Sequence, residues 1–454
     1  MRDRLRQTWR SALRLSWPVA VQQLLNTLMR SVDIVVTGLF SPAAVAAIGL
    51  ADLYAQIPFR IGRALGTGAI ALSSQDTGRG DVTARDQAVT QAVLIGFLVG
   101  LPIVAIGFVL AETFIRLLGA NAAVVELGGL YLTVVFAAAP MRIVALVAAR
   151  SLQGTGDTRT PLLVNGVANL LNIVGTVSLG LGLFGAPRLG ILGVGLATAV
   201  SRGLEATAML GVIAAHRTPL SLRRPRDRTV TRQLLGVSLP NFAEGMSTSV
   251  ASFPFNALLL VFGTEVSAAY HISRRIYQQL AGPLYRSYSV AASILVGISL
   301  GEGDPLGARF QGLAITALGG LTVGFVGALL WIGAGPLVRI FTTDPATVTY
   351  ATDFTRLSGV SMVFFGIFFP LAGSLQGASD TRTPFYARFT GTFGFMLGFS
   401  YLVGLHLGYG LSGVYVGIVL TYVWWALVAC TGFLWGDWAT RAERMMADRG
   451  QPAE

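Results

Sequence analysis

The sequence has 454 residues, of which 53% are apolar and only 12% are charged, and its mean hydropathy is +0.64. Soluble domains carry about a quarter charged residues, so the composition excludes a water-soluble fold and predicts that most of the surface faces lipid. All 33 basic residues are arginine; a Walker-type phosphate loop needs lysine, which excludes ATP-driven transport by this chain.

Apolar stretches long enough to cross about 30 Å of hydrocarbon recur along the whole chain. The first follows five arginines and continues to Leu39 without a clear cleavage site, so we expect a retained helix rather than a signal peptide. The pattern predicts an all-α membrane protein with twelve transmembrane helices, near 15–39, 45–73, 88–111, 124–149, 161–184, 190–214, 234–262, 266–299, 311–334, 347–374, 384–407 and 411–436.

The arginines gather on one side of these predicted spans. That side collects the arginines before residue 15, those of the polar stretch 215–233 and those of the C-terminal tail, whereas the other side has little beyond Arg116, Arg188 and Arg339. The positive-inside rule therefore places both termini in the cytoplasm, in a multi-pass protein of the plasma membrane. We read the basic charge as membrane topology, so no nucleic-acid partner is expected.

The two halves of the chain repeat one another. The run Gln-Gly-x-x-Asp-Thr-Arg-Thr-Pro begins at Gln153 and again at Gln376, an offset of 376 − 153 = 223. Each half contains an even number of spans, so the repeats share one orientation, and we expect the binding cavity between or within two bundles. The predicted domains are an N-terminal six-helix lobe at 1–214, a basic cytoplasmic linker at 215–233, a C-terminal six-helix lobe at 234–436 and a cytoplasmic tail at 437–454.

The repeated loops carry Asp157 and Arg159 in the first half, and Asp380 and Arg382 in the second. A short turn that caps the next helix explains these residue types. A gating latch between the lobes is the functional alternative, and the sequence leaves both readings open.

Ionisable residues inside the membrane are costly and are functional candidates by default. Asp33 lies in the first span, and Asn172, Thr176 and Thr198 fall at a similar depth in the fifth and sixth spans, roughly 9–18 Å below the outer boundary. Together they predict a proton or sodium site; the alternative is that the amides and hydroxyls merely hold helices together. Asn26 and Met29 share the face of Asp33, and Asn165 and Asn169 continue the fifth-span stripe, so these four are candidate substrate contacts.

The second half does not copy this arrangement. Pro18 pairs with Pro240 at an offset of 240 − 18 = 222, and by this offset Phe255 occupies the position equivalent to Asp33. Glu244 is the carboxyl well inside the seventh span, and Thr248 continues its face. A role in substrate binding or coupling and a purely structural pairing both remain open for Glu244. The three histidines fall in different segments and there is one cysteine, so neither a metal cluster nor a catalytic constellation is expected, and the chain is not predicted to be an enzyme.

The doubled loop, the opening Ser16-Trp17-Pro18 with Asp33 fifteen residues after the proline, and the segments Val45–Gly49 and Ala268–Ile272 resemble the multidrug and toxic compound extrusion (MATE) transporters. The resemblance implies a twelve-helix, two-bundle exporter. Such proteins exchange protons or sodium for small organic, often cationic and amphipathic, compounds by alternating access, act as monomers in the bilayer and use no cofactor.

Carried over to this chain, the resemblance assigns roles to single residues. Asp33 looks like the aspartate of the archaeal and DNA-damage-inducible type, Thr198 like the family's span-six threonine and Asn172 like its span-five asparagine. Thr176 replaces an aspartate, which favours a proton over sodium. Pro18 matches a proline at which the first span is thought to bend.

Two questions stay open at this stage. Pairing with Arg30, three residues before Asp33, would keep the carboxylate ionised. An alternative function is a lipid-linked oligosaccharide flippase of the same superfamily. Such proteins usually have a more basic central cavity because they handle pyrophosphate, and this chain has five intramembrane arginines, Arg30, Arg60, Arg63, Arg142 and Arg286. Glu244 lies one turn short of a glutamate that another group of the family uses.

Overall fold

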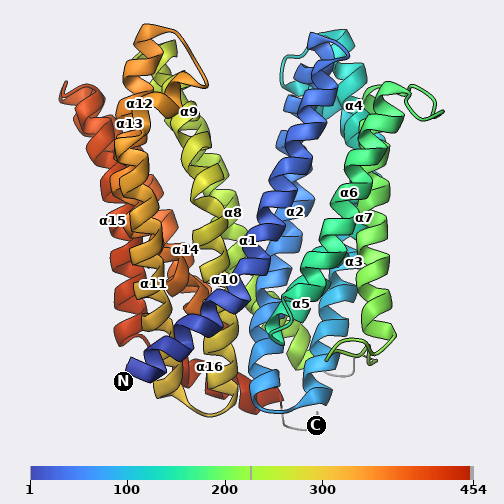
Figure 1. Cartoon of the computed structure of the whole chain (residues 1–454), viewed down its shortest axis with the longest axis vertical. Coiled ribbons are helices and arrows are strands. Elements are labelled where there is room, and N and C mark those ends of the chain that lie inside the picture. The colour runs from blue at the N-terminus through green and yellow to red at the C-terminus, as the bar shows by residue number, and fades with distance from the viewer. Residues whose placement is uncertain (1, 225–227, 450–454) are drawn as a thin grey trace. The chain divides into compact units, whose positions relative to one another are not determined.

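The computed structural model describes residues 2–224 and 228–449; residues 225–227 of the predicted linker and 450–454 of the predicted tail lie outside the described residues. The described residues form helices and no β-strand (Figure 1). In chain order the elements are α1 (Arg2–Gly38), α2 (Pro42–Gly78), α3 (Val82–Leu117), α4 (Ala122–Ala137), α5 (Ala139–Gly154), α6 (Arg159–Leu181), α7 (Ile191–Ala214), α8 (Arg228–Val261), α9 (Thr264–Leu280), α10 (Gly282–Gly301), α11 (Pro305–Ile332), α12 (Ala334–Arg339), α13 (Pro345–Gly377), α14 (Arg382–Gly391), η1 (Thr392–His406), α15 (Leu411–Trp435) and α16 (Trp438–Arg449).

These elements fill the twelve predicted spans of the described chain. Among the described residues, seven helices are individually long and apolar enough to cross a membrane, and α4 and α5, bent by 47° at their junction, meet the same criteria as a pair. Helices α1 and α8 are more polar, but their 37 and 34 residues reach about 50 Å at 1.5 Å per residue. The pairs α9–α10 and α14–η1 occupy the eighth and eleventh predicted spans.

Three predicted spans are less regular than a single α-helix. Pro140 lies in the first turn of α5 and Pro283 in the first turn of α10; proline lacks a backbone N–H, so a helix that meets one tends to bend or restart there. The eleventh span passes into η1, a stretch of π-helix, whose wider turns have i→i+5 hydrogen bonds. Hydropathy cannot distinguish these forms from a straight helix.

The described chain divides into two compact units. The C-terminal unit comprises the stretch up to Ala20, Ser74–Gly80 and Leu239–Asp448, and the N-terminal unit comprises Val21–Ser73, Asp81–Ser238 and Arg449. The division does not follow the sequence halves strictly, and the predicted lobe boundaries stay a prediction. Helix α1 passes from one unit to the other two residues after Pro18, and α8 does so one residue before Pro240.

Within the C-terminal unit, two glycines allow a close contact between α2 and α10. A Cβ atom on Gly78 would collide with the carbonyl oxygen of Ile298, and one on Gly301 would collide with that of Gln75. The last turns of α2 and α10 therefore approach backbone to backbone, which only glycine permits. The aspartates that follow cap the next helices: Asp81 accepts the N–H of Ala84 at 2.9 Å in the other unit, and Asp304 that of Gly307 at 2.7 Å.

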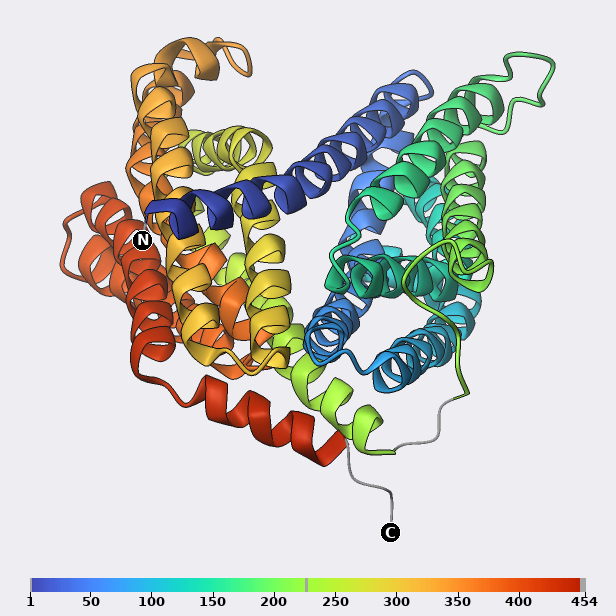
Figure 2. The same ribbon diagram turned by 60° about the horizontal axis from the view of Figure 1, so that its bottom comes forward.

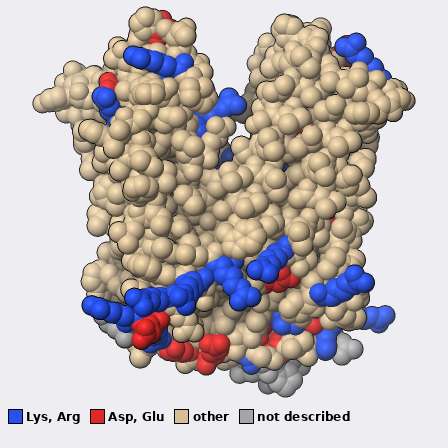
Figure 3. Space-filling view, in the orientation of Figure 1, with Lys and Arg blue, Asp and Glu red and all other residues tan. Residues whose placement is uncertain are grey.

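Helix α16 follows α15 after a sharp turn (Figure 2). Trp438 stacks on Phe433 at 4.9 Å between ring centroids and donates its indole N–H to the main chain of that residue. In the view of Figure 3, charged side chains gather towards the lower end of each unit, and the visible face above them carries few charges. Apolar side chains in the middle and charges at the ends are typical of membrane-spanning helices.

Candidate functional site

Asp33 lies on α1 inside the N-terminal unit, with 8% of its surface exposed. Its carboxylate Oδ1 accepts a hydrogen bond from the hydroxyl of Thr176 on α6 at 2.8 Å. The hydroxyl of Thr37 bonds the main-chain oxygen of Asp33 at 2.6 Å. The structure thus joins two of the predicted ion-site residues, although 143 positions separate them in the chain.

Asn172 and Thr198 complete this cluster. The Asn172 amide lies 3.1 Å from the hydroxyl of Thr198 and 3.3 Å from that of Ser201 on α7. With the amide turned to its other orientation, its nitrogen donates to Asp33 Oδ1 at 3.3 Å and its oxygen accepts from both hydroxyls. That orientation satisfies both ends of the amide. One carboxylate, one amide and the hydroxyls of Thr176, Thr198 and Ser201 therefore meet at one place between α1, α6 and α7, and we call these residues the Asp33 cluster.

The predicted substrate contacts Asn26, Met29, Asn165 and Asn169 form a second network nearer the start of α6. Asn169 donates to Asn26 at 3.1 Å and to Asn165 at 2.9 Å. Arg202 and Glu205 on α7 hold this network together. Their three-residue spacing in the sequence predicts that they pair, and they form a buried ion pair at 2.5 Å. Asn165 donates to Glu205 at 2.7 Å, whereas Arg202 donates to Asn169 and to the sulfur of Met29.

The open question of Arg30 has a geometric answer. Arg30 is exposed and, in the described part of the chain, forms no ion pair with Asp33. The charged groups near enough to act electrostatically on Asp33 are Arg202, Asp52 and Arg30. The carboxylate thus lies in a field of both signs without a direct basic partner.

Asp52 and Arg142 are two further ionisable residues inside predicted spans. The sequence analysis did not consider Asp52, and it considered Arg142 only in support of the flippase alternative. Asp52 lies on α2, on the same helix face as Ala55 and Phe59. Arg142 from α5 lies against this face, 3.4 Å from the carbonyl oxygen of Ala55 and 5.4 Å from the ring centroid of Phe59. The rule that singled out Asp33, a carboxyl within an apolar span, would have identified Asp52 too.

In the C-terminal unit, Glu244 on α8 pairs with Arg388 on α14, at 2.7 Å. The guanidinium of Arg388 also lies 4.7 Å from the centroid of the Trp425 ring. Thr248 turns its hydroxyl to the main-chain oxygen of Glu244 at 3.0 Å. The pairing gives Glu244 a structural partner, and its part in substrate binding stays a prediction.

The repeated loops place their aspartates against helix N-termini. Asp157 accepts the backbone N–H groups of Arg159 and Thr160 at 3.2 and 3.0 Å. Asp380 accepts from the backbone and hydroxyl of Thr383 at 3.2 and 2.8 Å. Arg159 and its counterpart Arg382 are exposed and form no ion pair among the residues the structure describes. These contacts are turn chemistry, and a gating role for the four charged residues stays a prediction.

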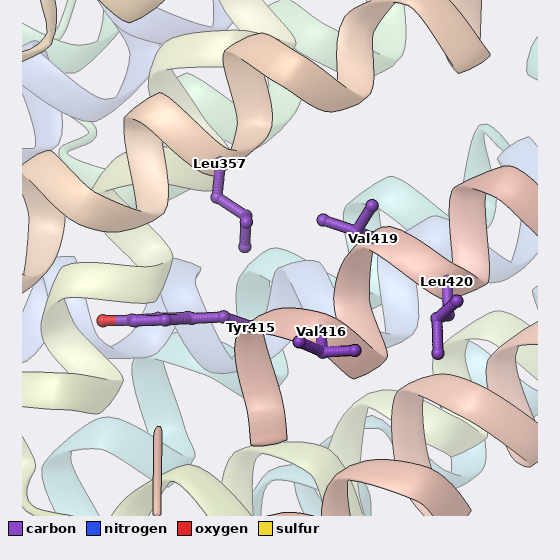
Figure 4. Close-up of a pocket in the computed structure, with 5 residues that line it drawn as sticks. All are labelled: Leu357, Tyr415, Val416, Val419 and Leu420. Atoms are coloured by element: carbon purple, nitrogen blue, oxygen red, sulfur yellow. The ribbon is translucent and has the colours of Figure 1, made fainter. Parts of the chain in front are cut away.

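In the described part of the chain, neither the arrangement of possible metal ligands nor the pocket of the C-terminal unit suggests a further site. Over the described ranges 2–224 and 228–449, no three His, Cys, Asp or Glu residues lie close enough to hold a metal ion. The C-terminal unit has an open pocket between α13 and α15 (Figure 4), whose side chains are hydrocarbon apart from the hydroxyl of Tyr415. The lining residues are Leu357, Tyr415, Val416, Val419 and Leu420.

Comparison with known proteins assigns this architecture. The MatE family model matches residues 18–177 and 240–402, two stretches that begin 240 − 18 = 222 residues apart, within one residue of the offset between the repeated loops. The chain is 26% identical to a "Probable multidrug resistance protein NorM" of Thermotoga maritima over 95% of this chain and 93% of that protein. A protein of the same name from Rhodopseudomonas palustris is 29% identical over 92% and 90% of the two chains.

The structure of a MOP superfamily transporter from Pyrococcus furiosus superposes with a TM-score of 0.86, at 22% identity, over 97% of both chains. This likeness shows the shared fold of membrane-spanning helices. The family match and the multidrug relatives do not favour the flippase alternative. The chain is therefore a transporter and not an enzyme: it spans the membrane several times and exports drugs and other toxic compounds, driven by an ion gradient. It belongs to the MatE family.

Proposed function

We propose that this transporter is a proton-coupled antiporter for organic, cationic amphipathic compounds, and that Asp33 carries the coupling proton. The observation that supports this proposal is the buried Asp33 carboxyl in a spanning helix, hydrogen-bonded by Thr176 at 2.8 Å. Intramembrane carboxyls of this kind mark proton relays in pumps and transporters. Thr176 and, in its favoured orientation, Asn172 hold the carboxyl in place, and Thr198 contacts the Asn172 amide.

The Asp33 cluster favours a proton over sodium. Asp33 is its single carboxylate, and the Thr176 hydroxyl points its hydrogen at it; in the favoured orientation the Asn172 amide nitrogen does so too. A hard cation prefers several oxygen ligands that face it with lone pairs. A proton needs only one carboxyl oxygen, so the cluster can take it up without rearranging.

Coupling follows from competition for one negative charge. A cationic compound is attracted to the site while Asp33 is ionised, and protonation of Asp33 removes that attraction. Because such linkage is reciprocal, binding of the compound also promotes release of the proton. A proton gradient can then drive export by alternating access. The polar network of Asn26, Met29, Asn165 and Asn169 supplies candidate contacts for the compound.

We also propose that both termini face the cytoplasm and that the chain acts as a monomer in the plasma membrane. The support is the arginine-rich character of the loops on the side of the N-terminus, which the positive-inside rule assigns to the cytoplasm.

The test uses the full chain in proteoliposomes that contain a pH-sensitive dye. Ethidium is added under an imposed proton gradient, with and without sodium. We expect ethidium-evoked proton movement without sodium, and its reduction to the level of protein-free vesicles in Asp33→Asn. Glu112→Gln is the matched control, because Glu112 is an exposed carboxyl at the end of α3, with 64% of its side chain exposed, and it should leave the signal unchanged.

Three outcomes would contradict the proposal. A strict sodium requirement would show that the Asp33 cluster binds sodium. Proton movement that survives in a folded Asp33→Asn protein would place the proton elsewhere, with Asp52 as the next carboxyl to replace. No ethidium-evoked signal in the wild type would reject cationic compounds as the cargo.

A further inference from the structure

The N-terminal unit holds a buried ion pair to which the proposed coupling gives no role. The side chains of Arg202 and Glu205 on α7 are 11% and 7% exposed, and their charged atoms lie 2.5 Å apart. Such a pair is weak evidence for stability, because the cost of taking two charges out of water offsets most of their attraction. Ionisable groups inside a membrane span are functional candidates by default.

Two helices place Arg202 close to the Asp33 cluster. On α7, the hydroxyl of Ser201 lies 3.3 Å from the amide of the cluster, and Arg202 is the next residue. On α1, the guanidinium of Arg202 contacts the sulfur of Met29 at 3.0 Å, and Met29 precedes Asp33 by about one helical turn. The positive charge is therefore separated from the carboxylate by one to two turns of helix, roughly 10 Å.

Hydrogen bonds fix the pair in this position. One guanidinium nitrogen of Arg202 donates to Glu205 at 2.5 Å, and the other donates to the amide oxygen of Asn169 at 3.2 Å. The second carboxylate oxygen of Glu205 accepts the amide of Asn165 at 2.7 Å. Because both asparagines lie on α6, which also carries part of the Asp33 cluster, the pair cannot move far from the cluster while these bonds last.

Other charges reach the same region from the surrounding helices. Besides the pair itself, the titratable or charged groups that act electrostatically there are Arg30 on α1, Asp52 on α2, Tyr131 on α4 and Arg142 on α5. The described side chains that α6 adds to the two networks are amides and hydroxyls. Arg202 differs from Arg30 and Arg142 in that its counter-charge is a carboxylate held by direct hydrogen bonds.

The charge of Arg202 affects whether Asp33 takes up a proton. A guanidinium without a counter-charge at this distance would favour the ionised carboxylate and oppose protonation. Glu205 places an equal negative charge against the guanidinium, so the two fields largely cancel at Asp33. At an effective dielectric constant of about 20, a single unit charge roughly 10 Å away shifts the midpoint of a titration by about one pH unit.

We propose that Glu205 is a positioning residue for proton coupling: by pairing with Arg202 it cancels the charge that would hold Asp33 ionised. The pair thereby sets the pH range over which proton uptake drives export. This inference rests on the proposed function of Asp33 and adds the groups that regulate it.

Infrared spectroscopy follows the Asp33 carboxyl directly. The carbonyl stretch of the protonated acid is recorded against pH for the full chain in nanodiscs, and the Asp33 band is the one lost in Asp33→Asn. We expect Glu205→Gln to move the midpoint of this titration about one unit to lower pH, because Arg202 keeps its charge without a partner. Arg202→Gln should move the midpoint to higher pH by a similar amount, because Glu205 then opposes ionisation of Asp33.

The double variant separates charge from packing. In Arg202→Gln/Glu205→Gln both charges are absent, so the midpoint should return close to that of the wild type, whereas an effect of lost contacts would be at least as large as in the single variants. Arg202→Gln decides the matter if Glu205→Gln does not fold, since Glu205 keeps its hydrogen bond from Asn165. Glu112→Gln is the matched control: Glu112 pairs with Arg116 in an exposed ion pair, and its loss should leave the midpoint unchanged.

Unmoved midpoints in the single variants, or shifts of the same sign in both, would overturn the role of the pair. The titration is read without transport, so it stands apart from the test of the proposed function. Proton movement that depends on Asp33 alongside unmoved midpoints would reject the pair and keep the proposed function. Opposite shifts together with proton movement that survives in Asp33→Asn would reject the proposed carrier and keep the electrostatic control of Asp33 by the pair.

Discussion

The ion pair between Glu244 and Arg388 allows a quantitative test of what Glu244 does. The two side chains are 9% and 18% exposed, and their charged atoms lie 2.7 Å apart. Replacing Glu244 by glutamine leaves the guanidinium buried without a counter-charge. Removing one partner of a buried pair typically costs about 3–5 kcal/mol. The Trp425 ring, 4.7 Å from the guanidinium, still stabilises it, so we expect a loss near the lower limit, about 3 kcal/mol.

Removing both charges should cost less than removing one. In Glu244→Gln/Arg388→Gln no unpaired charge remains, and two amides can still share a hydrogen bond, so we expect a loss of about 1 kcal/mol. With a loss of about 3 kcal/mol expected for Arg388→Gln as well, the coupling energy is several kcal/mol and well above the error of a double-mutant cycle.

The assay is unfolding of the full chain by SDS in mixed micelles, for the wild type, the two single variants and the double variant. Additive losses would refute the reasoning, because they would mean that the two charges do not interact in the folded protein. Unchanged stability of Glu244→Gln together with loss of ethidium transport would be equally informative. It would mean that Glu244 acts in substrate binding and not as the structural partner of Arg388.

Two further predictions concern packing and capping. Gly78→Ala forces a Cβ atom against the carbonyl oxygen of Ile298 and should destabilise the protein by about 1–3 kcal/mol in the same SDS assay. Gly203→Ala is the control: a Cβ atom there has no atom within 4 Å, so the change should be neutral or stabilising. Similar effects at both sites would contradict this prediction. Outside the membrane-spanning segments, hydrogen bonds from the hydroxyl and backbone N–H of Thr347 hold the pKa of Asp344 below its usual 3.8. This cap of α13 is fully present above pH 3.8 and is lost as the pH falls through the lowered pKa. Hydrogen-exchange protection of the Thr347 amide should therefore fall only in that range. Loss of protection near neutral pH, or the same loss at acid pH in Asp344→Ala, would count against this prediction.

Much of the candidate site follows from helical geometry alone. A fixed rise of 1.5 Å per residue and a period of 3.6 gave Asp33, Asn172, Thr176 and Thr198 a common depth, and the structure brings these four together. Asp52 escaped notice although the same rule applies to it. The partners of Glu205 and Glu244 differ in how far they lie along the chain: Arg202 is three residues away, whereas Arg388 is 144 residues away.

The sequence by itself determined the twelve spans, the repeat and the class of protein. Hydrocarbon offers no hydrogen-bond partners to the backbone, so an apolar stretch of sufficient length must be helical, and composition alone reveals such stretches. Only the tertiary structure decided which polar groups meet: that Thr176 bonds Asp33 while Arg30 does not pair with it, and that Arg388 neutralises Glu244. The physical reason is that such contacts depend on the rotation and packing of each helix against its neighbours, and many different packings satisfy the same hydrophobic pattern.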